Sequence, residues 1–352
     1  MRIFECQVCQ QLLYFENMVC ESCGSRLGFV AEDLTLRALR ETGSGLAPVD
    51  ADQTYKFCVN AAEDACNWLI PTQSDAAYCE ACKFNHTIPD LSDPENLIRW
   101  RKMEVAKHRL IYTLRRLRLP LVNKVEDPHG GLGFDFIADV PVEGGARVIK
   151  VMTGHENGLI TINLSEADDS SRELMRGHMG EPYRTLLGHL RHEIGHYYWE
   201  RLVRDTEHLA EFRSLFGDET ADYGAALAAY YVNGPAIGWQ NSFVSAYASA
   251  HPWEDFAETW AHYLHILDTL ETATAFRMRL DPTAGADPDL KVAITFDPFR
   301  APSVAQLMQA WLPLIYAVNS LNRSMGQPDL YPFVISPAVV TKLEFIHKIV
   351  QT

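Results

Sequence analysis

The amino-acid sequence predicts an α+β fold in which small cysteine-rich modules precede one larger domain. All eight cysteines lie between Cys6 and Cys82. Short β-rich runs separated by glycine-containing turns follow between Leu121 and Leu164, and helical patterns dominate from Ser171 onward. The domains that we expect are a zinc ribbon (1–30), a second four-cysteine module with its linker (31–94), and a domain with a small antiparallel or mixed sheet and a mostly helical C-terminal part (95–352).

The bulk composition is that of a globular protein with an acidic surface. The chain has 352 residues, of which 47% are hydrophobic, and this is enough for a substantial core. Its 46 acidic and 31 basic residues give a formal net charge of -15. This acidity argues against a general affinity for nucleic acids or anionic membranes, because both attract positively charged surfaces. We therefore expect neither of them as a partner.

Two features of the sequence bear on its location. The N-terminus, MRIFECQVCQQLL, has no apolar stretch of signal-peptide length. The two long stretches without charged residues, Tyr223 to Trp253 and Ala301 to Asn322, are interrupted by polar residues and proline, so neither is typical of a membrane span. We expect a cytoplasmic protein, in which thiols stay reduced and clustered CxxC pairs bind metal more often than they form disulfides.

The first cysteine set lies close to the N-terminus. Two CxxC pairs are separated by ten residues, and they consist of Cys6, Cys9, Cys20 and Cys23. Each pair can supply two of the four ligands of a tetrahedral zinc ion. Gly24 directly follows the second pair, which suits the tight turn that points backbone N–H groups at the thiolates. We predict a zinc ribbon here.

A second cysteine set follows and consists of Cys58, Cys66, Cys79 and Cys82. Only the last two have the usual CxxC spacing, because seven residues separate Cys58 from Cys66. We predict a second structural zinc site at these four residues, so that the chain would carry one or two structural zinc ions. His86 is an alternative ligand, although a surface position for it is the favoured interpretation.

The next element is a basic helix. The pattern from about Glu95 to Leu119 is helical, with an apolar face formed by Trp100, Met103, Leu110, Leu114 and Leu117. Between residues 99 and 118 there are eight basic side chains and one acidic one, Glu104. No aromatic interleaving or nucleic-acid motif accompanies them. We therefore interpret the run as a solvated helix face rather than as a nucleic-acid site.

The stretch GHLRHEIGHYYWE contains the motif HExxH, formed by His192, Glu193 and His196. Positions four apart lie on one face of a helix, so the two imidazoles can converge on one point. A hydrolytic zinc site needs about three protein ligands and one open position for water. The acidic residues downstream that offer the third ligand are Asp218, Glu219, Asp222, Glu254, Asp255 and Glu258.

Among these candidates, the pair in HPWEDFAETWAHYLH is favoured. FGDETADYG has Asp218 and Thr220 where the aspzincin signature needs Thr and Asp, so that match fails at the residues that bind metal. By contrast, Glu254 and Glu258 lie one turn apart on a helical pattern that opens at Pro252. One carboxylate can meet the metal while the other lies behind it.

These motifs resemble those of gluzincin peptidases of the lethal-factor type, in which HExxH is followed by a helix that carries ExFAE. The resemblance implies a zincin-like domain with Glu254 as the third zinc ligand, Glu258 behind the ligands, and Tyr247 facing the substrate. More broadly, the ribbon together with TGHENGLITINLSEAD, YRTLLGHLRHEIGHYYWERLV and the ExFAE helix is similar to a bacterial family of zinc-ribbon, zinc-binding metallopeptidases. This similarity covers nearly the whole chain.

The expected activity is hydrolysis of peptide bonds with one catalytic zinc ion. Glu193 would be the general base that takes a proton from water and returns it to the leaving amine. Glu258 would accept the second N–H of a ligating histidine and so fix its tautomer. The substrate would be a peptide or protein, and the zinc ribbons would recruit a substrate or partner protein.

Several interpretations stay open at this point. His189, His262 and His265 are interpreted as packed or solvent-linked histidines rather than ligands. The run GLITINL is either an edge strand that a peptide could extend or an ordinary core strand. Two other functions compete with the peptidase. One is a non-catalytic adaptor that binds protein or nucleic acid and carries a vestigial HExxH motif, and the other is a zinc hydrolase of a non-peptide amide.

Overall fold

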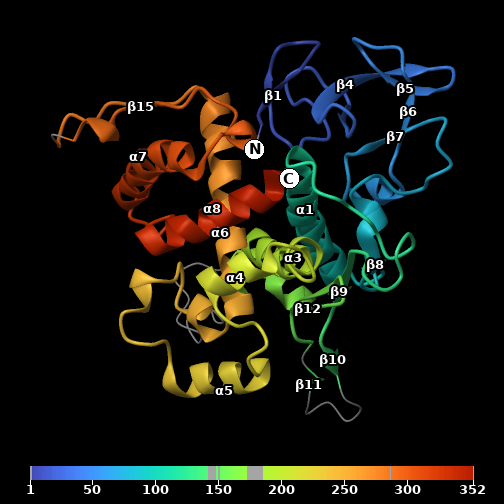
Figure 1. Cartoon of the computed structure of the whole chain (residues 1–352). Coiled ribbons are helices and arrows are strands. Elements are labelled where there is room, and N and C mark those ends of the chain that lie inside the picture. Colours follow the sequence, from blue (N-terminus) through green and yellow to red (C-terminus); the bar gives the residue numbers. More distant parts are fainter. Residues whose placement is uncertain (1, 142–147, 150, 173–184, 286, 352) are drawn as a thin grey trace. The chain divides into compact units, whose positions relative to one another are not determined.

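The computed structural model describes residues 2–141, 148–149, 151–172, 185–285 and 287–351 (Figure 1). The chain forms two compact units. Unit 1 comprises Met1–Arg115 and Pro120–Ser171, and unit 2 comprises Arg116–Leu119 and Arg172–Thr352. Strands concentrate in unit 1 and helices in unit 2, so the α+β class predicted from the sequence is confirmed. The predicted domain boundaries at residues 30 and 94 stay predictions.

The described residues of unit 1 form four small sheets and one long helix. Its helix is α1 (Pro94–Arg116), of which the last residue belongs to unit 2. The strands are β1 (Phe4–Glu5), β2 (Leu12–Leu13), β3 (Leu27–Val30), β4 (Thr35–Thr42), β5 (Gly45–Pro48), β6 (Tyr55–Phe57), β7 (Leu69–Pro71), β8 (Asn85–Thr87), β9 (Gly133–Ile137), β10 (Val140–Pro141), β11 (Val148–Ile149), β12 (Gly154–Glu156) and β13 (Leu159–Asn163).

The two larger sheets differ in strand direction. Strands β3 to β7 follow one another in an antiparallel five-stranded sheet, which connects the two cysteine sets along the chain. The second sheet has the order β12-β13-β9-β8, and β9 runs parallel to both of its neighbours. An aromatic cluster fills the core of unit 1, where the ring of Phe29 lies 4.6 Å from that of Trp68 and 5.0 Å from that of Phe15.

Strand β13 decides between the two interpretations of GLITINL. It pairs antiparallel with β12 on one side and parallel with β9 on the other. Ile160 and Ile162 are completely buried. GLITINL is therefore an internal core strand, and the edge-strand interpretation is wrong because β12 forms that edge of the sheet. His155 lies on β12 and accepts a hydrogen bond from the backbone N–H of Gly158 through Nε2 at 2.9 Å.

Helix α1 has the apolar face predicted from its sequence, but its charged residues are not simply solvated. Trp100, Met103, Leu110 and Leu114 are buried, and so are Glu104, Lys107 and His108. Most of the basic side chains pair with acidic residues of unit 1. The pairs are Arg99–Asp168, Arg101–Asp64, Lys107–Glu104, Arg109–Glu16 and Arg115–Glu80. The solvated-face interpretation therefore needs correction, because these cations neutralise acidic groups.

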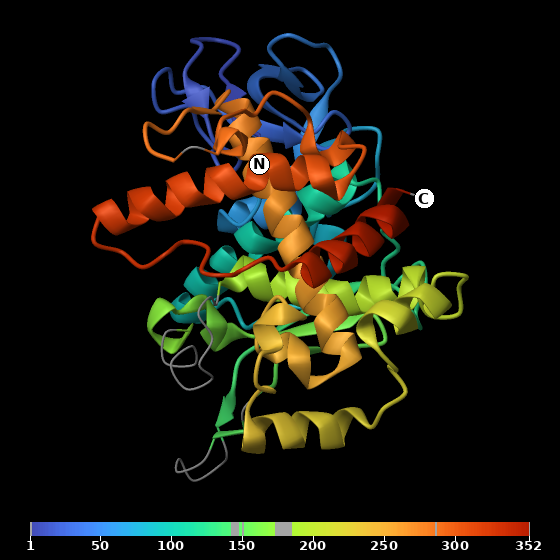
Figure 2. The ribbon, with the colours of Figure 1, turned by 60° about the vertical axis from the view of Figure 1, so that its left-hand side comes forward.

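Unit 2 is mainly helical. The helices are α3 (Leu186–Leu202), α4 (Leu209–Phe216), α5 (Tyr223–Asn233), α6 (Pro252–Ala275), α7 (Val304–Ser324) and α8 (Pro337–Gln351), and a short hairpin joins β14 (Arg279–Leu280) to β15 (Val292–Ala293). Helix α6 runs through the middle of unit 2 and packs against α3, α7 and α8 (Figure 1, Figure 2). Tyr198 of α3 stacks on Trp260 of α6 with ring centroids 5.0 Å apart. None of the described helices has the length and apolar character that a membrane crossing requires.

Candidate metal centres

The first cysteine set is brought together by the β1-β2 hairpin and the loop after it. The sulfurs of Cys6 and Cys23 lie 3.7 Å apart, and those of Cys9 and Cys20 lie 3.6 Å apart. Zinc with four thiolates at about 2.3 Å would place neighbouring sulfurs about 3.8 Å apart. Gly24 has φ +73°, a conformation that favours glycine, and its N–H donates to the Cys20 carbonyl. We name this set the ribbon cluster.

The second cysteine set also converges, despite its irregular spacing. Cys58, Cys66, Cys79 and Cys82 are all buried, and the sulfurs of Cys66 and Cys79 lie 3.7 Å apart. Burial raises the pKa of the Cys66 and Cys82 thiols, so four thiolates could not coexist there without a cation. A divalent metal would remove that cost. These four residues form the buried thiol cluster, and His86 lies elsewhere, paired with Asp135 at 2.8 Å.

Helix α1 adds residues to the buried thiol cluster that the sequence analysis missed. Nε2 of His108 lies 3.3 Å from the sulfur of Cys66 and 3.6 Å from that of Cys82. Its Nδ1 donates to the backbone carbonyl of Glu104 at 2.6 Å. Glu104 and His108 stand four residues apart and continue the apolar face of Trp100, and this position on the buried side was the available signal.

The HExxH helix approaches α6 closely because of one glycine. A Cβ atom at Gly195 would lie 2.9 Å from the Cα atom of Ala257, so no larger residue fits between the two backbones. Thr185 caps α3 by accepting from the N–H of Gly188. His251 caps α6 by accepting from the N–H of Trp253, and Pro252 occupies the first turn. The helix caps and the close contact between the two backbones hold α3 and α6 side by side where His192, His196 and Glu254 lie.

Three of the predicted ligands come together between these helices. Nε2 of His192 lies 3.2 Å from Nε2 of His196 and 3.0 Å from Oε2 of Glu254. The distance from Nε2 of His196 to the same Oε2 is 3.7 Å. A tetrahedral zinc with bonds of about 2.0 to 2.1 Å would place its ligand atoms about 3.3 Å apart. The donor set therefore fits zinc, and we name it the His/Glu centre.

Glu258 contacts the ring nitrogen of His192 that faces away from Glu254. Its Oε1 lies 2.7 Å from Nδ1 of His192 and accepts that N–H, which leaves Nε2 of His192 free to bind a cation. Its Oε2 accepts from the hydroxyl of Ser245 at 2.6 Å. Burial opposes the charge of this carboxylate, but the hydrogen bond and charge of His192, together with the contributions of His262 and Ser245, outweigh it and lower the pKa of Glu258 to about 2. Ser245 had no sequence signal of its own.

Glu193 is placed for proton transfer. Its side chain is buried, and within the described part of the chain its carboxylate has no hydrogen-bond partner. Burial raises the pKa of Glu193, although the neighbouring His192 acts in the opposite direction. A carboxylate whose pKa is raised in this way takes up a proton more readily than an exposed one.

Two tyrosines approach the His/Glu centre. The predicted Tyr247 is half-buried at the start of a short 3-10 helix (Tyr247–Ala250), and its ring lies 5.9 Å from the ring of His192. The sequence analysis missed Tyr223, whose hydroxyl donates to Oε1 of Glu254 at 2.6 Å. It lies in the stretch FGDETADYG, whose pattern points only to acidic metal ligands and gives no sign of a contact with Glu254.

The remaining histidines of α6 serve packing. His262 contacts the hydroxyl of Tyr331 through Nδ1 at 2.5 Å, and His265 lies 3.3 Å from a guanidinium nitrogen of Arg191. Burial lowers the pKa of His262 to about 4. Neither histidine belongs to a group of potential metal ligands among the described residues, and the same holds for His189.

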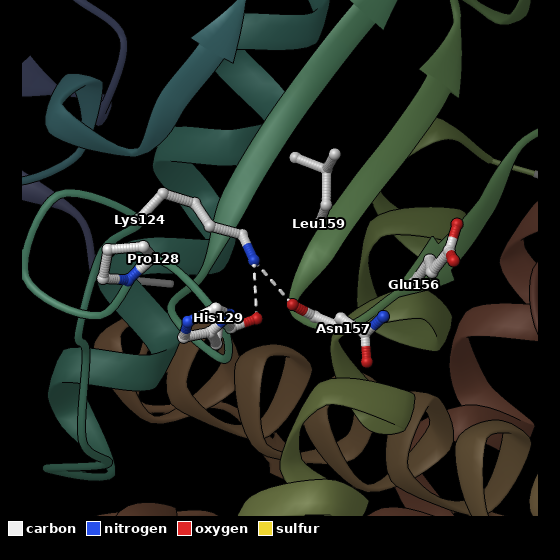
Figure 3. Close-up of a pocket in the computed structure, with 6 residues that line it drawn as sticks. All are labelled: Lys124, Pro128, His129, Glu156, Asn157 and Leu159. Carbon is white, nitrogen blue, oxygen red and sulfur yellow. Dashed lines mark hydrogen bonds between the residues drawn. The ribbon is translucent and has the colours of Figure 1, made fainter.

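A hollow in unit 1 offers no comparable chemistry (Figure 3). Its lining includes Lys124, His129, Glu156 and Asn157. The ammonium group of Lys124 already donates to the backbone carbonyls of His129 at 3.1 Å and Asn157 at 2.6 Å (Figure 3). This cation therefore stabilises the loop and the β12-β13 turn, and we assign no ligand to the hollow.

Comparison with known proteins places these centres in context. The model of a family described as "Putative zinc-binding metallo-peptidase" matches residues 96–349, which include the whole His/Glu centre. A model described as a zinc-ribbon domain matches residues 3–93, which include both cysteine clusters.

The chain also has relatives among curated proteins. An uncharacterized protein of Mycobacterium bovis and one of Mycobacterium tuberculosis are each 44% identical over 354 residues. The aligned region covers 100% of this chain and 96% of each relative. No solved structure matches the chain.

Proposed function

The chain belongs to this zinc-binding metallo-peptidase family, and we propose that it hydrolyses peptide bonds at the His/Glu centre. One observation carries the proposal. Three atoms suited to zinc converge from α3 and α6 within a few ångströms, and Glu193, whose carboxylate has no hydrogen-bond partner among the described residues, lies on the same helix turn as two of them. This arrangement is that of a reactive site rather than of a purely structural one.

We assign the zinc ligands as follows. His192, His196 and Glu254 would hold one zinc ion, and the ribbon cluster and the buried thiol cluster would each hold a structural one. Zinc at the His/Glu centre would supply a Lewis acid that acidifies water and polarises the amide carbonyl. The four-thiol sites leave no position for water, so we assign them no part in the reaction.

Glu193 is the general base and acid of the proposed reaction. Its carboxylate takes a proton from the attacking water and delivers it to the nitrogen of the leaving amine when the C–N bond breaks. The raised pKa that burial gives this group brings proton uptake closer to neutral pH. General acid and base groups of this kind contribute roughly 10²- to 10⁴-fold to rates.

Two further residues support the reaction. Glu258 holds Nδ1 of His192, so that the ring keeps the tautomer and orientation that a ligand needs. Tyr247 is the residue that we assign to the substrate, where its hydroxyl would donate to the oxygen of the scissile carbonyl as negative charge develops on it. The position of its ring beside that of His192 supports this assignment.

The two cysteine clusters have a separate proposed role. Both lie within residues that match a zinc-ribbon model, outside the stretch that matches the peptidase model. We propose that this region recruits a partner or substrate protein. The net charge of -15 gives no reason to expect nucleic acid as that partner.

The test is the variant Glu193→Gln in the full-length, zinc-loaded chain. We expect the rate of cleavage of a peptide library to fall by about 10²- to 10⁴-fold, while the zinc content stays that of the unchanged protein. Glu207→Gln is the matched control, because Glu207 is an exposed residue beyond the end of α3.

Other outcomes of this experiment favour other functions. If neither the unchanged protein nor the control cleaves any peptide but both release amine from small amides in a Glu193-dependent manner, the substrate is a non-peptide amide. Full peptide cleavage by Glu193→Gln would contradict the assignment of the base. Unchanged behaviour of the variant in every binding and cleavage assay would favour a non-catalytic adaptor.

A further inference from the structure

Tyr223 links a peripheral helix to the His/Glu centre. Helix α5 begins at Tyr223, is capped by Asp222, and contains no buried residue. Both views show it at the periphery of the helical unit (Figure 1, Figure 2). Tyr223 itself is 38% exposed, yet its hydroxyl reaches Oε1 of Glu254, a side chain that is only 1% exposed. A hydrogen bond from an exposed tyrosine to a buried carboxylate that is a metal-ligand candidate calls for a functional explanation.

We propose that Tyr223 is a positioning residue that restricts Glu254 to one metal-binding oxygen and thereby keeps a coordination position open for water. The inference rests on the proposed function, in which Glu254 is a zinc ligand. It concerns the carboxylate oxygen that faces away from the histidines, for which neither the family match nor the motif assigns a partner.

The geometry of Glu254 supports this role. Oε2 lies 3.0 Å from Nε2 of His192, whereas Oε1 accepts the hydroxyl of Tyr223 at 2.6 Å. A carboxylate can bind a metal through one oxygen or through both. Binding through both would occupy a further position at the metal, and a reactive zinc site needs that position for water. A strong hydrogen bond at Oε1 favours binding through Oε2 alone.

Tyr223 is itself fixed by the start of α6. Its ring lies 5.2 Å from the ring of His251 and 5.7 Å from that of Trp253. Because Nδ1 of His251 accepts from the backbone of Trp253, Nε2 carries the proton and donates to the carbonyl of Ala221 at 3.1 Å. His251 therefore ties the residues just before Tyr223 to the helix that carries Glu254.

The hydroxyl of Tyr223 is the donor of this contact, because an ionised carboxylate such as that of Glu254 can only accept a hydrogen bond. A phenylalanine at this position would retain the ring contacts and remove only the donor.

The test compares Tyr223→Phe with Tyr231→Phe in the full-length protein. Tyr231 lies on the same helix and is 59% exposed, so its variant controls for the loss of a phenol from α5. For Tyr223→Phe we expect kcat to fall by about 10- to 100-fold, with a smaller change in KM and an unchanged thermal transition. For Tyr231→Phe we expect kcat within about twofold of the unchanged protein, since surface substitutions change little.

A spectroscopic readout separates positioning from a general structural role. The protein is loaded with Co²⁺, and the spectrum of the His196→Ala variant is subtracted to isolate the His/Glu centre. We expect the visible bands of Tyr223→Phe to become weaker, because a second carboxylate oxygen raises the coordination number. Bands and kcat equal to those of the unchanged protein would overturn the inference.

The same experiment distinguishes this inference from the proposed function. If the centre takes up Co²⁺ and Tyr223→Phe alters its bands, but no peptide is cleaved by the unchanged protein, the positioning role holds and the peptidase proposal fails. If the spectrum of the unchanged protein equals that of His196→Ala, the centre binds no metal. Both proposals are then wrong.

Discussion

The buried thiol cluster and the His/Glu centre use metal ligands in opposite ways. The thiol cluster has four protein donors of one kind, all of them buried, and backbone N–H groups point at its sulfurs. The His/Glu centre has three donors of two kinds, and a further carboxylate, that of Glu193, stands beside them without a hydrogen-bond partner among the described residues. The first arrangement leaves no place for a substrate, whereas the second does.

The difference teaches that surroundings decide the role of a metal as much as its ligands do. Around the thiol cluster, Glu104 and Lys107 form a buried ion pair at 2.7 Å, and Nε2 of His108 lies 3.3 Å from the sulfur of Cys66. Around the His/Glu centre, Glu258 is hydrogen-bonded to His192, Ser245 to Glu258, and Tyr223 to Glu254. The polar neighbours of the thiol cluster pair with one another or pack against it, whereas those of the His/Glu centre form hydrogen bonds to its ligand candidates and to Glu258.

The largest expected effect is the loss of stability when a ligand of the buried thiol cluster is removed. Replacing a buried ligand by Cys66→Ala should lower the free energy of unfolding of the zinc-loaded protein by several kcal/mol, on the order of 5 kcal/mol or more, because metal binding contributes directly to folding. His196→Ala should lower it by only about 1 to 3 kcal/mol while abolishing cleavage. Denaturant unfolding and zinc content of both variants check this contrast.

Two results would remove the distinction between the centres. One is a Cys66→Ala protein that unfolds like the unchanged chain. The other is a His196→Ala protein that loses all three zinc ions, since that would mean that the sites depend on each other rather than serve separate roles.

A smaller effect, on catalysis, is expected when Glu258 beside the His/Glu centre is changed. In Glu258→Gln, the carboxylate that accepts from Nδ1 of His192 is replaced by a neutral amide. We expect kcat/KM to fall by about 10- to 100-fold, since groups that orient metal-binding histidines have effects of this size. The thermal transition of the variant shows whether the fold is retained. A variant with unchanged kcat/KM and zinc affinity would contradict the orienting role.

Local spacing made the ligand sets predictable. CxxC pairs, HExxH and ExxxE each place donors on one turn or one helix face, so Cys79 with Cys82, His192 with His196, and Glu254 with Glu258 could be paired from the sequence alone. The apolar face of α1 and the helix that starts at Pro252 followed from periodicity and from capping residues in the same way.

The partners of Tyr223 and His108 could not be predicted, because they are distant in sequence. Tyr223 lies 31 residues from Glu254, and His108 lies 42 residues from Cys66. The helical pattern indicates that His108 is buried, but no fixed spacing links either residue to the ligand that it contacts. The internal position of β13 could not be predicted either, since an internal strand and an edge strand differ in their neighbours in the sheet rather than in their own residues.

The most direct test of the account is a crystallographic map of anomalous scattering measured on both sides of the zinc absorption edge. We predict a zinc peak in the buried thiol cluster, another in the ribbon cluster, and a third about 2.0 to 2.2 Å from Nε2 of His192, Nε2 of His196 and Oε2 of Glu254. Zinc found only among the thiols, in protein prepared with excess zinc, would contradict the existence of a reactive centre.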